Sequence, residues 1–118
     1  MTQHYFSEDP SVERRQRTVR FEVAGKEIEA LSISGTFSTT KLDPGTKVLL
    51  SLHEHFPTAG DVLDIGCGWG PIALSIALSS PKTEVFAVDI NERAVSQTIE
   101  NAKHLGLANI KSVMPTGL

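Results

Sequence analysis

The sequence predicts an α/β protein whose second half forms part of a doubly wound parallel sheet. From residue 59 onward, apolar runs of strand length alternate with helical patterns in the order strand, helix, strand, helix, strand. The first strand runs into a glycine-rich loop that opens a helix, and the second ends in an acidic residue. Two successive right-handed crossovers of this kind build the first half, strands 1 to 3, of a Rossmann-like sheet.

Length and composition limit the class of protein. A chain of 118 residues fits one domain, and 40% apolar with 21% charged residues is typical of a globular protein. The net charge of -3 excludes binding to nucleic acid through a general basic excess, so any RNA contact must be local. The single cysteine, Cys67, favours a reducing compartment, and we expect a cytoplasmic protein. No apolar run approaches the roughly 20 residues of a membrane span, so we expect no membrane insertion.

We interpret residues 1–118 as one domain, in which residues 1–17 form a polar arm. The arm carries a basic stretch, Arg14, Arg15 and Arg17. These arginines could contact RNA phosphates, although a solvated arm beside an edge strand explains them nearly as well.

Residues 18–58 are expected to form a hairpin and a lead-in helix. The hairpin turns at Gly25, because alternating apolar residues flank it on both sides: Val19, Phe21 and Val23 before it, Ile28 and Ala30 after it. Asp43 can cap the helix and Pro44 suits its first position. Apolar residues then recur at helical spacing until Pro57 ends the helix: Val48, Leu49, Leu52 and Phe56. His53 and His55 are two apart on this helix, so they cannot chelate one metal together.

Residues 59–118 supply the strand-helix alternation. Val62, Leu63 and Ile65 form a nearly continuous apolar run, as expected of a strand covered on both faces. The following elements are a helix over 71–80 ended by Pro81, a strand over 83–90, a helix over 92–105 stopped by Gly106, and a strand over 109–114.

The glycine loop indicates a nucleoside ligand. Gly66, Gly68 and Gly70 follow the first strand, where a bare backbone allows unusual dihedral angles and close ligand approach. Asp89 lies 19 residues after Gly70, close to the offset at which an acidic residue accepts ribose hydroxyls. Asp89 could instead cap the next helix, but Asn91 is better placed for that role.

The loop departs from a dinucleotide site. The third glycine of such a site allows tight packing, and here that place is taken by Pro71, which also lacks an amide donor. Asp64 would repel a pyrophosphate but could attract an amino acid ammonium, or could cap loop amides. S-adenosylmethionine, an adenosine with an ammonium and no phosphate, fits this pattern. Cys67 and Trp69 are most simply explained by packing.

At this point the sequence resembles a known family. The segments "VLDIGCGWGPIALSIA", "VFAVDINERAV" and "ENAKHLGL" are similar to the cofactor half of class I S-adenosylmethionine-dependent methyltransferases. The upstream "HYFSEDPSV" and "SGTFSTTKLDPGTKVLL" more narrowly resemble the small methyltransferase domain of bacterial 16S ribosomal RNA guanine-N2 methyltransferases. The resemblance spans nearly the whole chain.

The resemblance implies roles for individual residues. The methionine portion of the cofactor would be surrounded by Asp64 and the loop residues Gly66, Cys67, Gly68 and Gly70. Asp89 would take the ribose hydroxyls, Ile90 and Asn91 would flank adenine and ribose, and Phe37 and Thr46 would lie near the pocket. Thr116 stands where the family has an acidic residue near the adenine amine.

The family's Asn-Pro-Pro-aromatic motif, which follows the fourth strand, does not occur in the 118 residues. By the resemblance, the fourth strand and this motif are expected beyond Leu118. The catalytic residues therefore stay unassigned, and we expect the isolated chain to bind the cofactor without transferring a methyl group. No metal is expected, because methyl transfer from a sulfonium needs mainly alignment in a dry site. Without the fourth strand, an exposed sheet edge is expected to promote self-association.

The function implied is methylation of a guanine exocyclic amine, with ribosomal RNA or the small ribosomal subunit as partner. Two alternatives stay open from the sequence. One is half of a nicotinamide-dependent dehydrogenase, against which Pro71 and Asp64 argue. The other is a cofactor-binding module without chemistry of its own.

Overall fold

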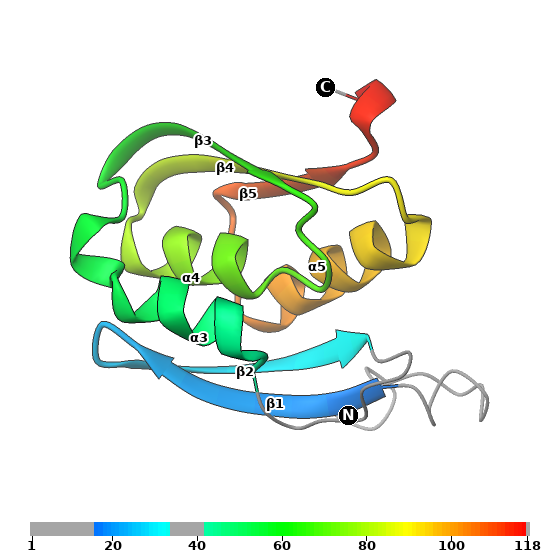
Figure 1. Ribbon diagram of the computed structural model, residues 1–118. Helices are drawn as coiled ribbons and strands as arrows, with labels where there is room; N and C mark the ends of the chain where they lie inside the picture. Colours follow the sequence, from blue (N-terminus) through cyan, green and yellow to red (C-terminus); the bar gives the residue numbers. More distant parts are fainter. Residues whose placement is uncertain (1–15, 34–41, 118) are drawn as a thin grey trace.

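The computed structural model describes residues 16–33 and 42–117, which form three layers (Figure 1). The elements are β1 (Gln16–Val23), β2 (Lys26–Ile33), α3 (Pro44–Ser51), the 3-10 helix η1 (His53–His55), β3 (Ala59–Ile65), α4 (Pro71–Ser79), β4 (Lys82–Val88), α5 (Glu92–His104), β5 (Ile110–Val113) and the 3-10 helix η2 (Pro115–Gly117). The sheet β3-β4-β5 is parallel, the helices form the middle layer, and the β1-β2 hairpin lies beneath them. This confirms the predicted α/β class and element order.

The hairpin turns where the sequence indicated. Ala24 and Gly25 both have positive φ, 50° and 79°, as a two-residue turn matched to the strand twist requires. β1 begins earlier than predicted, so that Gln16 and Arg17, assigned above to the arm, lie in the strand. The register pairs Phe21 with Ile28. The buried face of the hairpin includes Val19, Val23, Ile28 and Ala30.

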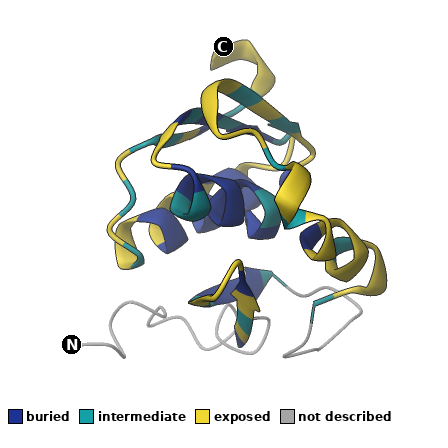
Figure 2. Ribbon diagram, turned by 90° about the vertical axis from the view of Figure 1, so that its left-hand side faces the viewer, coloured by how far each residue is buried: buried dark blue, intermediate teal, exposed yellow. Residues whose placement is uncertain are grey.

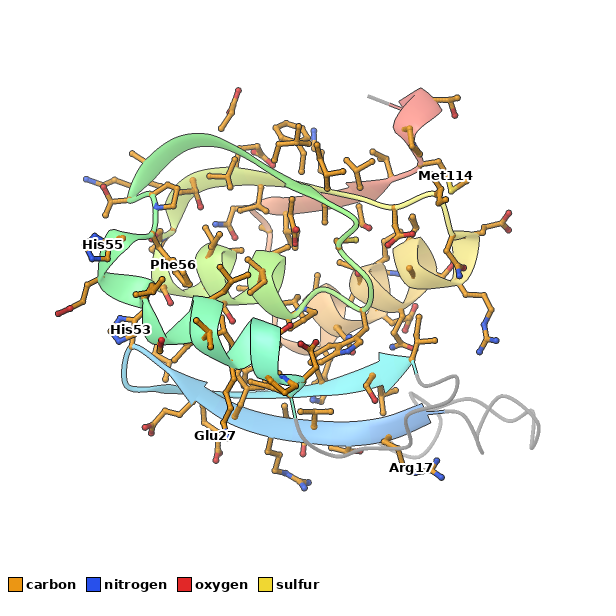
Figure 3. All side chains as sticks on the ribbon, viewed as in Figure 1. Arg17, Glu27, His53, His55, Phe56 and Met114 are labelled. Atoms are coloured by element: carbon orange, nitrogen blue, oxygen red, sulfur yellow. The ribbon has the colours of Figure 1, made fainter. Side chains whose placement is uncertain are left out.

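Helix α3 starts as predicted but is shorter. The Oδ1 atom of Asp43 accepts a hydrogen bond from the Thr46 amide at 3.0 Å, and Pro44 occupies the first turn. The helix ends at Ser51 and η1 follows. Pro57 disfavours a helical conformation at Phe56, which is extended at φ -65°, ψ 147° and ends η1. Phe56 points into the helix layer and packs against both core clusters, whereas His53 and His55 lie at the periphery (Figure 3).

The apolar residues that recur at helical spacing do not form the buried face of α3. Leu50 is its buried residue, at 5% exposure. Val48, Leu49 and Leu52 are 62%, 52% and 49% exposed. Periodicity located the helix correctly, but it did not identify which side packs against the rest of the protein.

The prediction that the first parallel strand is covered on both faces is wrong for the described residues. β3 is an edge strand paired only with β4. Val62 packs toward the helices, whereas Leu63 and Ile65 point to the other face and are 52% and 78% exposed. The reason is that, in the described ranges, the helices lie on one side of the sheet (Figure 1).

Two core clusters hold the layers together. The first contacts the hairpin, α3, α4 and α5 through Val23, Ile28, Ala30, Leu50, Leu74 and Ala102. The second joins the helices to the sheet through Cys67, Ala73, Ile76, Ala77, Val85 and Ala87. Figure 2 shows the buried residues concentrated on the helices between the two β layers. No helix within residues 16–33 and 42–117 is long and apolar enough to cross a membrane.

Candidate functional site

The candidate site lies at the carboxyl edge of the sheet. The glycine loop leaves β3 and enters α4 at Pro71, and Asp89 directly follows β4. Open α/β sheets bind ligands outside the carboxyl ends of their strands. The fold therefore brings the loop and Asp89 to one edge, as the sequence predicted.

The three glycines have positive φ but different surroundings. Gly66 and Gly68 have φ of 74° and 60°, and a Cβ atom at either position would meet no atom within 4 Å. Gly70 has φ of 95°, and a Cβ atom there would lie 2.9 Å from Cγ2 of Thr98 on α5. The first two glycines thus leave an open backbone surface, whereas Gly70 permits close packing of the loop on α5.

Four amides of the loop donate hydrogen bonds within the protein. The donors and acceptors are Gly66 N to Val88 O (2.7 Å), Cys67 N to Val88 O (3.0 Å), Gly68 N to Asp89 Oδ2 (2.9 Å) and Gly70 N to Cys67 O (3.0 Å). Pro71 has no amide hydrogen to donate. A pyrophosphate site needs amides directed at the ligand, so this loop is suited to a ligand without phosphate.

Asp89 keeps acceptor capacity for a ligand. Its Oδ2 accepts from Gly68 and its Oδ1 accepts from the Asn91 amide at 2.8 Å. A carboxylate has about four acceptor positions, which leaves two for a pair of ribose hydroxyls. The Asn91 side chain caps α5 by accepting from the Arg93 amide at 2.9 Å, as expected. Ile90 is 82% exposed beside Asp89 and offers an apolar surface.

The Asp64 side chain is half-buried, and its carboxylate is only partly satisfied by hydrogen bonds. Its Oδ2 is buried and has no hydrogen-bond partner among the described residues. Burial raises the pKa of Asp64, a hydrogen bond from the Ala73 backbone opposes this, and the charge of Asp89 raises the pKa further. Asp64 therefore caps one backbone amide at the start of α4 and retains an oxygen that a cationic ligand group could satisfy.

Cys67 and Trp69 have packing roles. Cys67 is 6% exposed, its Sγ lies 3.7 Å from Oγ1 of Thr98, and burial raises the pKa of the thiol, which disfavours a nucleophilic thiolate. The Trp69 ring makes an edge-on contact with Phe21, with centroids 6.3 Å apart.

The predicted site residue Thr46, and Thr116 at the position where the family has an acidic residue, are not brought to the loop by any described contact. The Thr46 hydroxyl donates to Oδ2 of Asp43 at 2.9 Å, so its side chain serves the cap of α3. Thr116 is exposed in η2. Neither residue therefore extends the candidate site that the loop and Asp89 form.

Some of the predicted positions lie outside the described residues. They are Phe37, Arg14, Arg15 and Leu118, the last being the residue beyond which the catalytic motif is expected. The pocket role of Phe37, the RNA contacts of the two arginines and the placement of the motif after Leu118 stay predictions.

Sequence reasoning missed two residues beneath the loop. Thr98 and Asn101 on α5 are fully buried and hydrogen-bond to the backbone of Gly68 and Trp69, respectively. The sequence signal that could have indicated these two residues was their position on the helix. They occupy the buried face of α5 with Ala94, Val95 and Ala102, and polar residues in such an apolar face need partners.

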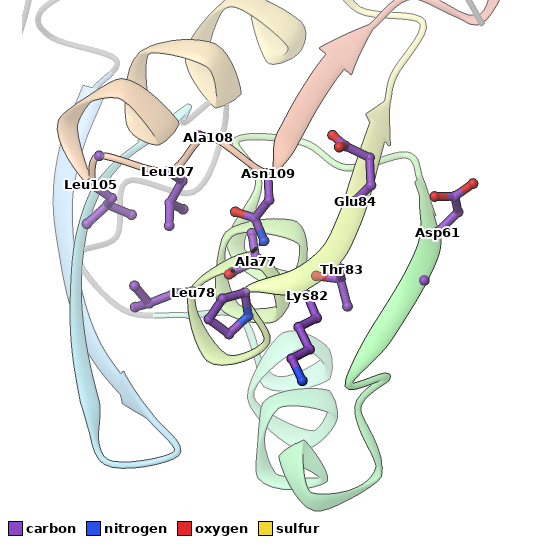
Figure 4. Close-up of a pocket in the computed structure, with 13 residues that line it drawn as sticks. Asp61, Ala77, Leu78, Lys82, Thr83, Glu84, Leu105, Leu107, Ala108 and Asn109 are labelled. Carbon is purple, nitrogen blue, oxygen red and sulfur yellow. Dashed lines mark hydrogen bonds between the residues drawn. The ribbon is translucent and has the colours of Figure 1, made fainter.

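The described residues also form an open cleft of about 660 Å³ at the opposite end of the strands (Figure 4). Asp61, Lys82 and Glu84 line it together with the segment that joins α5 to β5. It is lined by none of the predicted site residues. Within the described ranges, no group of three or more histidine, cysteine or acidic side chains could hold a metal ion.

Together, the parallel sheet, the open glycine loop and the acidic residue after β4 define an α/β protein with a candidate ligand site at the carboxyl edge of its sheet. A family model, Methyltransferase small domain, matches residues 27–116. The chain therefore belongs to the methyltransferase small domain family.

Relatives agree with this assignment. The chain is 40% identical over 111 residues to the uncharacterized protein YbxB of Bacillus subtilis, covering 94% of this chain and 55% of that protein. It is 41% identical over 80 residues to ribosomal RNA small subunit methyltransferase C of Shewanella sediminis, covering 67% of this chain and 22% of that protein. The chain thus spans about half, or less, of these relatives.

Solved structures show the same fold. A SAM-dependent methyltransferase from Agrobacterium tumefaciens superimposes with a TM-score of 0.56 at 23% identity, covering 82% of this chain and 32% of that one. TrmN from Thermus thermophilus gives a TM-score of 0.50 at 33% identity, covering 58% of this chain and 21% of that one.

Proposed function

We propose that this chain is the cofactor-binding part of an S-adenosylmethionine-dependent methyltransferase. The observation that carries the proposal is the pair of carboxylates beside the open loop. Asp89 retains two acceptor positions, and Asp64 retains a buried oxygen without a described partner. A ligand with ribose hydroxyls and an ammonium would satisfy both.

The described residues fit the parts of this cofactor. Asp89 would accept the ribose hydroxyls, and Ile90 would cover the adenine. Asp64 would face the ammonium of the methionine portion, directly or through a water molecule. Gly66 and Gly68 would let this portion lie against bare backbone. When bound, the cofactor supplies an activated methyl group on its sulfonium.

The loop geometry disfavours a dinucleotide. Four of its amides donate within the protein, Pro71 replaces a donor, and Asp64 would repel a pyrophosphate. We therefore do not retain a nicotinamide-dependent dehydrogenase as a second candidate.

For the substrate, we propose the exocyclic amine of a guanine in ribosomal RNA. Support comes from relatives named as ribosomal RNA small subunit methyltransferases and from the upstream resemblance. RNA bases must be unstacked before an enzyme can act on them. Arg17 in β1 belongs to the basic stretch identified in the sequence and is a candidate phosphate contact.

We assign the cofactor-binding step to this chain. Methyl transfer also needs groups that hold the acceptor amine, and the family resemblance places these in an Asn-Pro-Pro turn that the 118 residues do not contain. A cytoplasmic location remains part of the proposal.

Calorimetry with the purified chain tests the proposal. We expect S-adenosylhomocysteine to bind with one-to-one stoichiometry and NADH to give no heat of binding. Asp89→Asn should weaken S-adenosylhomocysteine binding by about tenfold, since it replaces an ionic acceptor of two hydroxyls by a neutral amide. Glu92→Gln, on the exposed first turn of α5, is the matched control and should bind like the wild type. Binding of NADH, or of neither ligand, would refute the proposal.

A further inference from the structure

Two buried polar side chains on α5 contact the cofactor loop from the side opposite the proposed ligand. We call Thr98 and Asn101 the loop clamp. Both have 0% exposure, so neither can serve as a surface polar residue. Their polar atoms must therefore find hydrogen-bond partners within the protein.

Thr98 holds the Gly68 peptide. Its Oγ1 donates to the Gly68 carbonyl at 2.9 Å, while the Gly68 amide donates to Asp89 at 2.9 Å. The residue at the centre of the loop is thus held by one polar side chain on each side. The methyl group of Thr98 also lies against Gly70, where a Cβ atom would come within 2.9 Å.

Asn101 connects the loop to the hairpin. Its Nδ2 donates to the Trp69 carbonyl at 3.0 Å and to the Leu31 carbonyl at 2.9 Å, and its Oδ1 accepts from the Leu31 amide at 2.9 Å. The side chain therefore satisfies both backbone groups of Leu31 on the outer edge of β2, as a neighbouring strand would. Leu31 and Asn101 are 70 residues apart in sequence.

This arrangement bears directly on ligand affinity. Gly66, Gly68 and Gly70 have more conformational freedom than other residues, and that freedom is lost when a ligand orders the loop. Side chains that fix the loop beforehand reduce the entropy lost on binding. A buried side-chain amide with several protein partners is suited to this, because removing it leaves those partners unsatisfied.

We propose that Thr98 and Asn101 are positioning residues that pre-organise the cofactor loop, and that Asn101 couples the loop to the β1-β2 hairpin. This inference rests on the proposed function, because the affinity it concerns is that for the cofactor. Neither residue touches the ligand.

The first test compares two substitutions of Thr98. Thr98→Val keeps the shape and removes the hydroxyl, so the dissociation constant for S-adenosylhomocysteine should rise by about tenfold. Thr98→Ser retains the hydroxyl and should bind within about threefold of the wild type. Equal affinities of the Val and Ser variants would overturn the role of Thr98.

The second test compares two side-chain amides that bridge separate parts of the fold, the buried Asn101 and the half-buried Asn109. Asn101→Leu should weaken S-adenosylhomocysteine binding by about tenfold or more. Asn109→Leu is the matched control, since Asn109 donates to the Ala77 carbonyl at 3.0 Å at the other end of the sheet. It should lower thermal stability while leaving affinity within about twofold. Equal weakening by both variants, each folded by circular dichroism, would show a general stability effect and overturn the proposal.

Amide hydrogen exchange separates this inference from the proposed function. Without ligand, exchange at Gly68 and Gly70 should accelerate in Thr98→Val and Asn101→Leu but not in Asn109→Leu. In the wild type, S-adenosylhomocysteine should slow exchange at Leu31, far from the ligand. If the wild type binds no S-adenosylhomocysteine, the proposed function fails. Unchanged exchange in the ligand-free Thr98 and Asn101 variants would instead refute the proposal that these residues pre-organise the loop. Protection confined to the loop would refute the coupling to the hairpin.

Discussion

The two sides of the cofactor loop differ in how they are covered. On the closed side, toward α5 and the hairpin, Thr98 and Asn101 are fully buried and every layer contributes to the packing. On the open side, the face of β3 that is turned away from the helices is uncovered in the described residues, and Leu63 and Ile65 are 52% and 78% exposed. Polar residues are buried on the closed side and apolar residues are exposed on the open side, so apolar content alone does not determine burial.

The difference shows that side chains on one side hold the loop backbone, while the other side of the loop is open to a ligand. The closed side fixes the backbone of Gly68 and Trp69, whereas Gly66 and Gly68 face open space. The open side combines an edge strand with exposed apolar side chains, a surface on which further protein packs. Self-association through this edge stays a prediction from the sequence, and the following predictions test the contrast.

The largest expected effect is at Gly70, on the closed side. Gly70→Ala introduces a Cβ atom 2.9 Å from Thr98 at a φ of 95°, and should lower the free energy of unfolding by about 4 kcal/mol. Gly66→Ala meets no neighbour and should cost about 1 kcal/mol from its positive φ alone. Urea unfolding measures both, and equal costs would contradict the assignment of Gly70 to packing.

Helix α3 offers the same contrast in two adjacent leucines. Leu50→Ala removes a core side chain and should destabilise by about 3 kcal/mol. Leu49→Ala, at an exposed position, should change the free energy of unfolding by less than about 0.5 kcal/mol. A cost at Leu49 that disappears on dilution would instead place this residue in a contact between copies.

A charged substitution on β3 tests whether its open edge promotes self-association. Ile65→Lys should shift the isolated chain toward monomer in light scattering, because a lysine on an edge strand opposes pairing. Folding stability should change by less than about 0.5 kcal/mol. Glu100→Lys, on the exposed surface of α5, makes a larger charge change and should leave association unaltered. A clean monomer of the unmodified chain would refute self-association.

The smallest expected effect concerns Asp64 and pH. Burial holds the pKa of Asp64 above its ordinary value of 3.8, so the folded state retains this proton longer than the unfolded state does. Folding stability from this group is therefore highest at low pH and falls as pH rises through the folded-state pKa. Asp64→Asn should remove that fall in thermal melts, while weakening S-adenosylhomocysteine binding at neutral pH. An unchanged pH profile would contradict the burial of this carboxyl group.

Much of the fold could be predicted from the sequence because its signals are local. The turn at Gly25, the caps at Asp43 and Asn91, and the strand-helix order depend on neighbouring residues. The position of Asp89 beside the loop also follows from parallel strands ending at one edge.

Other features could not be predicted because they depend on distant contacts. Asn101 reaches Leu31 across 70 residues, and no local pattern indicates that partner. The separate role of Gly70 requires knowing that Thr98 lies beneath it. The exposure of Leu63 and Ile65 depends on which elements cover the sheet, and a continuous apolar run does not record this.

The most direct test of the central claim is an amide chemical-shift titration of the chain with S-adenosylhomocysteine. The account predicts saturable shifts that are largest at Gly66, Gly68, Asp89 and Ile90, with smaller shifts at Leu31. Shifts centred on Asp61, Lys82 and Glu84 at the opposite end of the strands, or no shifts at the loop, would contradict it.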